Sequence, residues 1–306
     1  MLTNHLNLPA PLVAACEDHH LSSGSDLSLT SVYAPAKQVA LQKLHRDAIT
    51  EDASQRIWSV LGQGVHTILE RATKADGIVT FSEERWERPV LGWRVACRID
   101  HLTLEPALHA LTDYKVTSVW SVKDGAKDEW VKQVNLQYLL APDAIQSQIT
   151  KLQVVAILRD WRKNERLRFD DYPAAQVVVV PIPLWPTAKT AAYLEGRVAI
   201  HQSAQAALEN TGKQPQSGMA LSMMGHLPDC TPEERWERPT VFAVHKKGNK
   251  GATRLYEVRA LAEQHVASQP GLELKIRPGE SPRCAQYCSA LAFCPQGQAL
   301  VCPTPP

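Results

Sequence analysis

Seven identical residues, EERWERP, occur twice in this chain of 306 residues, at Glu83–Pro89 and at Glu233–Pro239. A duplicated domain also repeats the hydrophobic pattern of its flanks, because each repeat is one structural unit. Here the flanks differ: the first copy lies between GIVTFS and VLGWRVACRID, and the second between HLPDC and TVFAVHKKGNKG. We therefore expect a fold without internal duplication, in which the two copies have different neighbourhoods.

The order of helix and strand patterns predicts the α/β class. An amphipathic helix is expected over residues 53–72, with apolar side chains at helical spacing: Ile57, Leu61, Val65, Ile68 and Leu69. Three strand patterns follow (GIVTFSEERW, GWRVACRIDHLTL and ALTDYKVTSVW), then a helix (KDEWVKQVNLQYLLA), two strands (KLQVVAILRDW and AQVVVVPIPLW) and a long helix. The run Val177–Val180 does not alternate, which predicts a strand buried on both faces.

Composition limits the class of protein. With 44% hydrophobic and 21% charged residues, the chain is typical of a folded soluble protein, long enough for one core and a subdomain. A net charge of +1 requires any nucleic acid to bind a local basic patch. No apolar run is long enough to span a bilayer, and the lipobox-like LVAAC lacks a basic segment before it. We expect a cytoplasmic protein with reduced thiols.

The same patterns divide the chain into three parts. We expect an N-terminal segment over residues 1–45, an α/β core over 46–212, and a smaller cysteine-containing subdomain over 213–306. The last part contains a basic hairpin around HKKGNKGATR.

Two aspartates belong to strand patterns that are close in the chain. Asp100 ends CRID, and Asp113 begins the triplet DYK that ends at Lys115. The residues between them, HLTLEPALHALT, are long enough for a loop that brings two strands side by side. Carboxylates on adjacent strands can hold a hard cation such as Mg²⁺. Asp113 and Lys115 share one face of their strand, which places a fixed positive charge beside the metal.

Two neighbouring segments carry further polar groups. His66 lies on the helical pattern within GQGVHTILE, one turn from Glu70, and is a candidate ligand. Glu83 and Glu84 precede Asp100 along the chain. We interpret these two glutamates as part of a solvated strand end. The alternative is that one of them hydrogen-bonds to the metal ligands without binding the metal itself.

This succession resembles the PD-(D/E)xK nucleases, in particular their RecB-like exonuclease branch. In that branch G-x-x-x-H-x-x-L-E is followed by G-x-x-D, by D-x-K and by a helix with Q and Y. This chain has GQGVHTILE, CRID, DYK and QVNLQY over roughly residues 54–138. The resemblance implies a restriction-endonuclease-like fold, with a mixed central sheet flanked by helices and a small C-terminal cysteine subdomain.

The resemblance also implies a role for each matched residue. The catalytic residues would be Asp100, Asp113, Lys115 and Gln133. An Mg²⁺ or Mn²⁺ ion would be bound by His66, Asp100, Asp113 and the backbone carbonyl of Tyr114. One departure concerns Tyr138, which lies five residues after Gln133, whereas the family usually has four.

The C-terminal part contains a cysteine triplet. Cys284, Cys288 and Cys294 follow the spacing C-x3-C-x5-C, and reduced thiols this close together indicate a metal. A fourth ligand is needed, for which Cys230 is favoured over Cys302 in the Pro-rich tail. The triplet resembles the iron–sulfur staple of AddB-type helicase-nucleases and of related CRISPR-associated nucleases. The resemblance implies a [4Fe–4S] cluster, and Zn²⁺ is the alternative.

Two basic segments are candidates for contact with DNA. One is RDWRKNERLR, with Arg159, Trp161 and Arg162, and the other contains Lys246, Lys247 and Lys250. Basic side chains next to an indole can bind phosphates and stack a base, as in channels for single strands. A solvated polar loop is the alternative for either segment.

We expect a metal-dependent DNA nuclease, an exonuclease acting on DNA ends or single strands. The resemblance would suit phage recombination and repair, with a recombination protein or a second copy of the chain as partner. A different class of function is a catalytically inactive DNA-binding or partner-binding module with a structural metal–cysteine unit. A third is an iron–sulfur redox protein.

Overall fold

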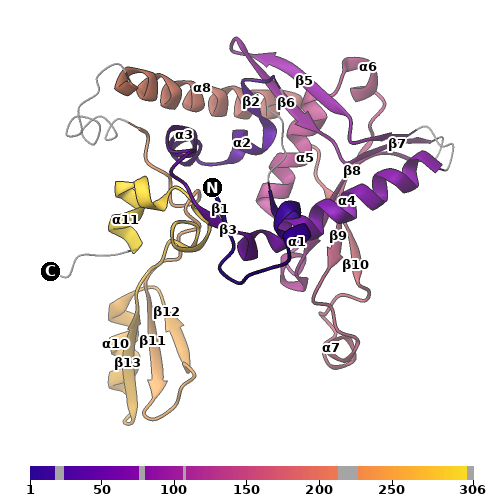
Figure 1. The fold of residues 1–306 in the computed structure, drawn as a ribbon. Helices are drawn as coiled ribbons and strands as arrows, with labels where there is room; N and C mark the ends of the chain where they lie inside the picture. Colours follow the sequence, from indigo (N-terminus) through magenta and orange to yellow (C-terminus); the bar gives the residue numbers. More distant parts are fainter. Residues whose placement is uncertain (18–23, 76–79, 106–107, 213–226, 302–306) are drawn as a thin grey trace. The chain divides into compact units, whose positions relative to one another are not determined.

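The computed structural model describes residues 1–17, 24–75, 80–105, 108–212 and 227–301. Two compact units are present (Figure 1). Unit 1 comprises Met1–Ala36 and Thr50–Met224, and unit 2 comprises Lys37–Ile49 and Gly225–Pro306. Several sheets flanked by helices place the protein in the α/β class, as the sequence predicts.

Unit 1 is built around a mixed five-stranded sheet with the order β10-β9-β8-β7-β4. Its strands are β4 (Thr80–Ser82), β7 (His101–Glu105), β8 (Leu108–Thr117), β9 (Lys151–Leu158) and β10 (Val177–Ile182). Strands β8 and β9 run parallel, and the other neighbours are antiparallel. The parallel pair requires a crossover, which contains helix α5 (Asp128–Leu140).

A second sheet continues the first through a bend. It contains β2 (Leu27–Ser28), β5 (Arg85–Val90) and β6 (Trp93–Arg98), in the order β2-β6-β5. Segment β4–β5 is antiparallel to segment β6–β7, and the register is the same in both sheets: Ser82 pairs with His101, and Arg85 with Arg98. The two segments therefore form one long hairpin that passes from one sheet to the other at residues 83–84 and 99–100.

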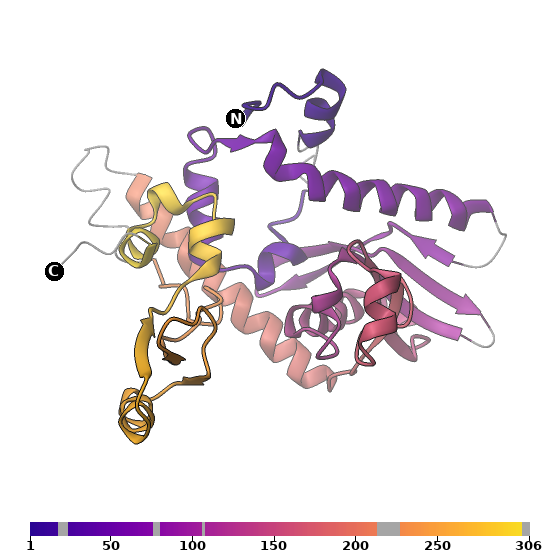
Figure 2. The same cartoon turned by 90° about the horizontal axis from the view of Figure 1, so that it is seen from below.

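Helices pack against these sheets and enclose the main core. Helix α4 (Ile57–Ala75), which follows the short helix η1 (Ala53–Arg56), crosses the strands and contacts β8 and β4 (Figures 1 and 2). Helix α5 packs against both sheets, and α8 (Thr187–Gly212) packs against α5. The remaining helices of unit 1 are α2 (Leu29–Tyr33), η2 (Val119–Ser121), α6 (Asp143–Gln146) and α7 (Lys163–Arg168). Buried aliphatic side chains of β8, β9 and α5 form the centre of this core.

Two expectations about the strands are wrong. Strand β10 was expected to be buried on both faces, but it is an edge strand whose Val177 and Val179 are exposed, while Val180 and Ile182 are buried. An edge strand packed on one side needs no alternating sequence, because valine tolerates exposure. The residues between Asp100 and Asp113 do not form a simple loop either, since they include β7 and the start of β8.

The two EERWERP copies adopt different structures. In the first copy the chain enters β5, and Trp86 is 2% exposed within the main core. In the second copy the chain forms a turn, and Trp236 has a positive φ of 55° and is 38% exposed. The guanidinium of Arg283 lies 4.3 Å from the centre of the Trp236 ring. The flanking sequence, and the partners it brings, therefore decide the conformation of this heptapeptide.

Unit 2 combines a small sheet with an irregular cysteine-containing segment. The sheet has the order β12-β11-β13, and its elements are β11 (Val241–Lys246), β12 (Arg254–Tyr256), α10 (Arg259–Ser268) and β13 (Leu272–Arg277). Val244, Ala262 and Leu272 form the centre of its core. The rest of the unit contains α3 (Ala36–Leu44), η4 (Arg283–Tyr287), η5 (Leu291–Phe293) and α11 (Pro295–Val301).

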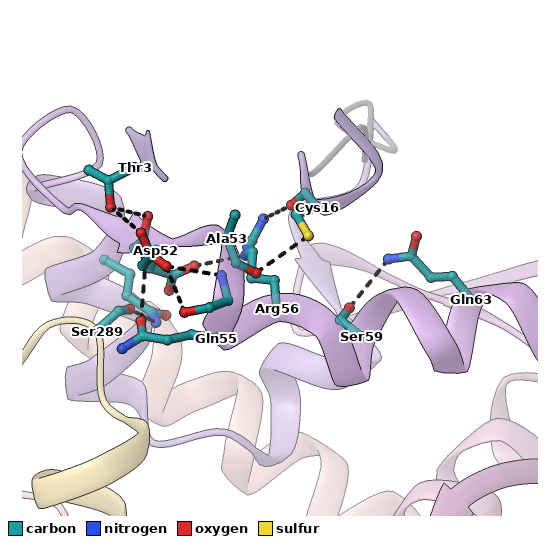
Figure 3. A network of polar contacts seen from close by, with 12 residues as sticks. Thr3, Cys16, Asp52, Ala53, Gln55, Arg56, Ser59, Gln63 and Ser289 are labelled. Carbon is teal, nitrogen blue, oxygen red and sulfur yellow. Dashed lines mark hydrogen bonds and ion pairs between the residues drawn. The ribbon is translucent and has the colours of Figure 1, made fainter. Parts of the chain in front are cut away.

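One carboxylate makes four of the hydrogen bonds in the region where the N-terminal segment is attached (Figure 3). Strand β1 (Leu2–Thr3), which precedes α1 (Ala10–Cys16), pairs with β3 (Glu51–Asp52). The Asp52 carboxylate accepts hydrogen bonds from the Ser54 hydroxyl (2.6 Å), the Ser54 amide (3.1 Å), the His5 amide (2.8 Å) and the Thr3 hydroxyl (3.0 Å). It therefore caps η1 and holds the strand at the same time.

We predict that Asp52→Ala releases the N-terminal segment. Hydrogen bonds from Ser54 and His5 hold the Asp52 pKa well below its usual range. Because this folded-state pKa is lowered, the stabilisation is present above about pH 4 and is lost as the pH falls through the folded-state value. At neutral pH, hydrogen exchange at the His5 amide should accelerate and the Tm should fall. Asp170→Ala, which alters an exposed carboxylate, is the control, and equal exchange in both variants would contradict the clamp.

Candidate metal centre and cysteine site

Three carboxylates lie in a row across neighbouring strands. The hairpin register places Glu83 opposite Asp100, and the Glu83 amide donates to the Asp100 carbonyl oxygen at 3.4 Å. The next pair of strands joins His101 to Thr112, so that Asp100 falls opposite Asp113. The Tyr114 amide fixes this arrangement by donating to Asp100 Oδ2 at 2.7 Å. The bend between the two sheets therefore gathers negative charge at one place.

His66 of α4 completes a group that can hold a metal ion. Its Nδ1 lies 3.4 Å from Glu83 Oε1 and 3.5 Å from Asp100 Oδ1. Among the described residues, His66, Glu83 and Asp100 form the group of three whose ligand atoms all lie within 4.8 Å of one another. Two carboxylate oxygens and an imidazole nitrogen suit a small divalent ion such as Mn²⁺ or Mg²⁺.

Asp113 occupies the inner end of the row and is fully buried. Its Oδ2 lies 2.6 Å from Lys115 Nζ, as expected for two side chains on one face of β8. Its Oδ1 accepts hydrogen bonds from the Gln133 amide at 2.6 Å and from the Gln137 amide at 3.4 Å. The structure thus brings Asp113, Lys115 and Gln133 together, and adds Gln137, one helical turn after Gln133.

Crowding of these charges shifts their proton affinities. Burial, and then the charge of Asp113, raise the pKa of Asp100 to about 7. The hydrogen bond to Glu83, and less strongly the charge of Asp100, raise the pKa of His66 although burial lowers it. Burial also lowers the pKa of Lys115, but the attraction and hydrogen bond of Asp113 outweigh it, so the net shift is upward. The centre therefore favours bound cations and bound protons.

Glu83 is the residue of this centre whose role differs from the expectation. It was interpreted as part of a solvated strand end, yet its carboxylate lies within the group of three. Its backbone has a positive φ of 54°, which is uncommon outside glycine and marks the bend between β4 and β5. No periodicity in the sequence signals such a bend. Glu84 does not belong to the group. Its backbone carbonyl accepts a hydrogen bond from the Ile99 amide across the hairpin.

The remaining predicted residues occupy definite places around the centre. Tyr114 contributes its amide to Asp100, and its carbonyl as a metal ligand stays a prediction. Tyr138 packs against the main core, and the side chain four residues after Gln133 is that of Gln137. Tyr33 of α2, which sequence reasoning missed, is buried near the charges of Lys115 and Asp113, and burial raises its pKa.

The cysteines of unit 2 lie in the irregular segment around η4, η5 and α11, except Cys230, which precedes β11 in the chain. Cys284 lies in η4, Cys288 follows this helix, and Cys294 precedes α11. Burial raises the pKa of Cys230 to about 12, and the charges of Glu234, Cys294 and Cys284 act in the same direction. Burial likewise raises the pKa of Cys284 and Cys288, and the neighbouring Cys294 raises both further.

Backbone contacts place Cys230 beside the triplet. The Gln296 side chain accepts from the Cys230 amide and donates to its carbonyl, both at 3.0 Å, which ties Cys230 to the first turn of α11. The Gly297 amide donates to Cys294 Sγ at 3.3 Å. A Cβ at Gly297 would lie 2.9 Å from Leu291 Cδ1, so a larger residue here would require the Leu291 side chain to shift. Cys302, the other candidate ligand, lies outside the described residues.

The basic segments have different structures. Arg159 follows β9 and is exposed, whereas Trp161 packs against the main core and donates its indole N–H to Pro173. Arg162 is exposed at the start of α7. The other predicted cations, Lys246, Lys247 and Lys250, are exposed at the end of β11 and in the loop that follows it.

Comparisons with known proteins provide little information about this site. No family model matches the chain, and no curated protein matches it. Among solved structures, one titled "Crystal structure of SSO0001" aligns with a TM-score of 0.43 and 17% identity, covering 62% of this chain and 84% of that one. No helix in the described ranges has the length and apolar character needed to cross a membrane.

Asp100 should make the metal-free protein less stable as the pH rises. Its folded-state pKa of about 7 exceeds the usual value of about 4, so the folded state keeps a proton that the unfolded state releases. The stabilisation is present below about pH 4 and is lost as the pH rises through 7. We expect the Tm in EDTA to fall from about pH 5 to about pH 8, and to fall less in Asp100→Asn.

The comparison with Asp100→Asn is needed because the raised pKa of His66 also makes the Tm fall as the pH rises, in the wild-type protein and in the variant alike. Mn²⁺ should reverse the trend in the wild-type protein, since the ion binds the ionised carboxylate. Equal slopes for the wild-type and Asp100→Asn proteins in EDTA would show that Asp100 ionises in its usual range.

Proposed function

We propose that this protein is a metal-dependent nuclease of the PD-(D/E)xK type that hydrolyses phosphodiester bonds at DNA ends or in single strands. The observation that carries the proposal is the row Glu83, Asp100 and Asp113 across adjacent strands, with Lys115 paired to Asp113. Under this proposal the mixed sheet with α4 and α5 is a restriction-endonuclease-like core.

The residues present fit a divalent ion. His66, Glu83 and Asp100 supply one nitrogen and two oxygen donors within 4.8 Å of one another, and burial and the charge of Asp113 raise the pKa of Asp100. Bound there, Mg²⁺ or Mn²⁺ would polarise the phosphoryl oxygen and lower the pKa of a bound water. Crowded carboxylates that lose stability by ionising are typical of a site evolved to bind a cation.

Lys115 places a positive charge at a defined position in the centre. Its ammonium is held 2.6 Å from Asp113 Oδ2, and Gln133 fixes the other oxygen of the same carboxylate. The ammonium thus has a defined position beside the ligands, where it orients an attacking water and stabilises the charge that develops on the phosphoryl oxygens. Its raised pKa keeps it positively charged over the physiological pH range.

We also propose that Cys230, Cys284, Cys288 and Cys294 hold a [4Fe–4S] cluster. Cys230, Cys284 and Cys288 have raised pKa values, so these thiols need a bound metal to become thiolates. Among the described residues, no three cysteine sulfurs lie within 4.8 Å of one another. One Zn²⁺ with bonds of about 2.3 Å would hold four sulfurs roughly 3.8 Å apart, and a four-iron cluster accommodates wider spacing.

We predict that Asp113→Asn and Lys115→Ala remove cleavage while leaving the protein folded. Loss of one preorganised stabilising charge typically lowers the rate by about 10²–10³, and Asp113→Asn also loses the anchor of Lys115. End-labelled single-stranded and duplex DNA would be incubated with Mg²⁺, Mn²⁺ or EDTA and the products resolved by length. Lys151→Ala, an exposed lysine at the start of β9, is the matched control.

Cleavage by the wild-type protein in EDTA, or near wild-type cleavage by Lys115→Ala at saturating Mn²⁺, would contradict the nuclease proposal. Normal circular dichroism of each variant ensures that a loss of activity reports the site.

We predict that Cys288→Ser and Cys230→Ser abolish binding of the cluster, with a lower Tm and faster proteolysis of unit 2. Protein purified without oxygen should be brown and should contain iron and sulfide. Cys302→Ser should keep the iron, because Gln296 already places Cys230 beside the triplet. Colourless protein with stoichiometric zinc would overturn the cluster, and loss of iron in Cys302→Ser with retention in Cys230→Ser would overturn the choice of fourth ligand.

A further inference from the structure

Two exposed indoles of unit 1 are each accompanied by a cation. Trp58 at the start of α4 is 59% exposed, and the guanidinium carbon of Arg159 lies 4.2 Å from the centre of its ring. Trp120 in η2 is 72% exposed, with Lys123 Nζ 5.6 Å from its ring centre. Large aromatic side chains are usually well buried, so two such pairs on one unit require an explanation.

Their positions along α4 and at the end of β9 place Trp58 and Arg159 near the metal centre. Trp58 precedes His66 by eight residues of one helix, which corresponds to a rise of about 12 Å. Arg159 follows Ala156, the β9 partner of Lys115, by three residues, about 10 Å along the strand. This span equals that of three or four stacked nucleotides at about 3.4 Å each.

Hydrogen bonds connect the segments that carry the two pairs. The Arg159 amide donates to the Thr117 carbonyl at 2.9 Å, which fixes the position of Arg159 at the end of the β8–β9 pair. The Val119 amide donates to Asp160 Oδ1 at 2.8 Å, so that η2 with Trp120 starts beside the residue after Arg159. The two aromatic–cation pairs therefore lie at the same end of the sheet, where strands β8 and β9 finish.

Helical geometry places Trp58 on the side of the exposed apolar face of α4 that is nearer to His66. At 3.6 residues per turn, Trp58 is rotated about 80° from His66, whereas Leu61 and Ile68 are rotated about 140° and 160° in the same sense. Leu61, three residues after Trp58, is its neighbour on the helix surface, and Ile68 lies on the side of α4 away from His66. The cation above the Trp58 ring also distinguishes it from an apolar docking face.

An indole that keeps one ring face open and an arginine beside it match an unpaired nucleotide. The base stacks on the ring, which contributes about 1–3 kcal/mol per base, and the arginine attracts the phosphate. A base inside a duplex has both faces covered by its neighbours and must first be extruded. The chemistry of the two pairs therefore favours a strand whose bases are unstacked.

We propose that Trp58 and Arg159 form a nucleotide-stacking site that seats an unpaired base three or four nucleotides from the metal centre, with Trp120 and Lys123 extending it. This assignment rests on the proposed nuclease function and adds residues that determine its specificity. Trp161, which the sequence indicated for stacking, has its indole N–H bonded to Pro173 and its ring packed in the core.

Binding without cleavage tests the stacking site. Wild-type protein in EDTA would be titrated into a single-stranded oligonucleotide containing 2-aminopurine, whose fluorescence is quenched on stacking. Trp58→Ala should weaken binding about tenfold, since stacking of one base is worth about 1–3 kcal/mol, and should abolish the quenching. Trp58→Phe should retain part of both effects. Arg159→Gln should lower the salt dependence of binding. Ile68→Ala, exposed on the far side of α4, is the matched control.

An abasic oligonucleotide separates stacking from a structural role. Without a base to stack, Trp58→Ala and the wild type should bind equally well. A tenfold loss on the abasic strand as well, or equal affinity of Trp58→Ala and wild type for the normal strand, would overturn the stacking site. A change of sedimentation in both Trp58→Ala and Ile68→Ala would instead assign the exposed side of α4 to self-association. Loss of stacking in Trp58→Ala, together with unchanged cleavage in Asp113→Asn, would refute the nuclease site while leaving the stacking site standing.

Discussion

Repulsion among Glu83, Asp100 and Asp113 is the constraint around which unit 1 is organised. The register of one bent hairpin and of the next strand pair places these carboxylates opposite one another. Their charges are partly compensated within the protein, by Lys115 at Asp113 and by His66 at the outer two. Burial of Asp100, and then the charge of Asp113, outweigh the attraction of His66 and Lys115, so the pKa of Asp100 rises to about 7. A folded chain keeps such an arrangement because the strands around it are stabilised by a large apolar core.

The bend that creates this row also explains why EERWERP has no fixed structure of its own. In its first copy Trp86 enters the main core, and Glu83 reaches His66 and Asp100 through a left-handed backbone conformation. In its second copy the tryptophan contacts Arg283 and Tyr287 near the cysteines. Seven residues contribute too little local preference to outweigh the burial of one large side chain, so tertiary context decides.

Predictability from sequence follows the same division between local and nonlocal causes. Asp113 and Lys115 could be placed on one face because strand alternation is a local rule, and the two side chains are in contact. Gln133 was named only through the resemblance to a family, and the structure places it beside Asp113. Glu83 could not be predicted, since its approach to Asp100 depends on a register shared by two sheets and on a positive φ. Trp161 and Val177 show the converse: their residue types are informative, but whether a side chain faces the core or the solvent depends on neighbouring strands. The long helix after β10 was predicted because its pattern extends over many residues.

In unit 2, the cysteine-containing segment has few buried apolar side chains to stabilise it. The segment with three of the cysteines consists of short helices and turns, and only a few of its apolar side chains are buried. A separate sheet with its own small core stands in the sequence between Cys230 and Cys284, so that closing the distance between these thiols costs loop entropy. The paired hydrogen bonds of Gln296 offset part of this cost by holding Cys230 at α11. What remains unfavourable is the approach of buried thiols whose proton affinities are already raised, and a bound metal removes that obstacle because it replaces several protons at once. Under the proposed function, a metal at the cysteine site would therefore stabilise unit 2, whereas the carboxylate row would carry the chemistry.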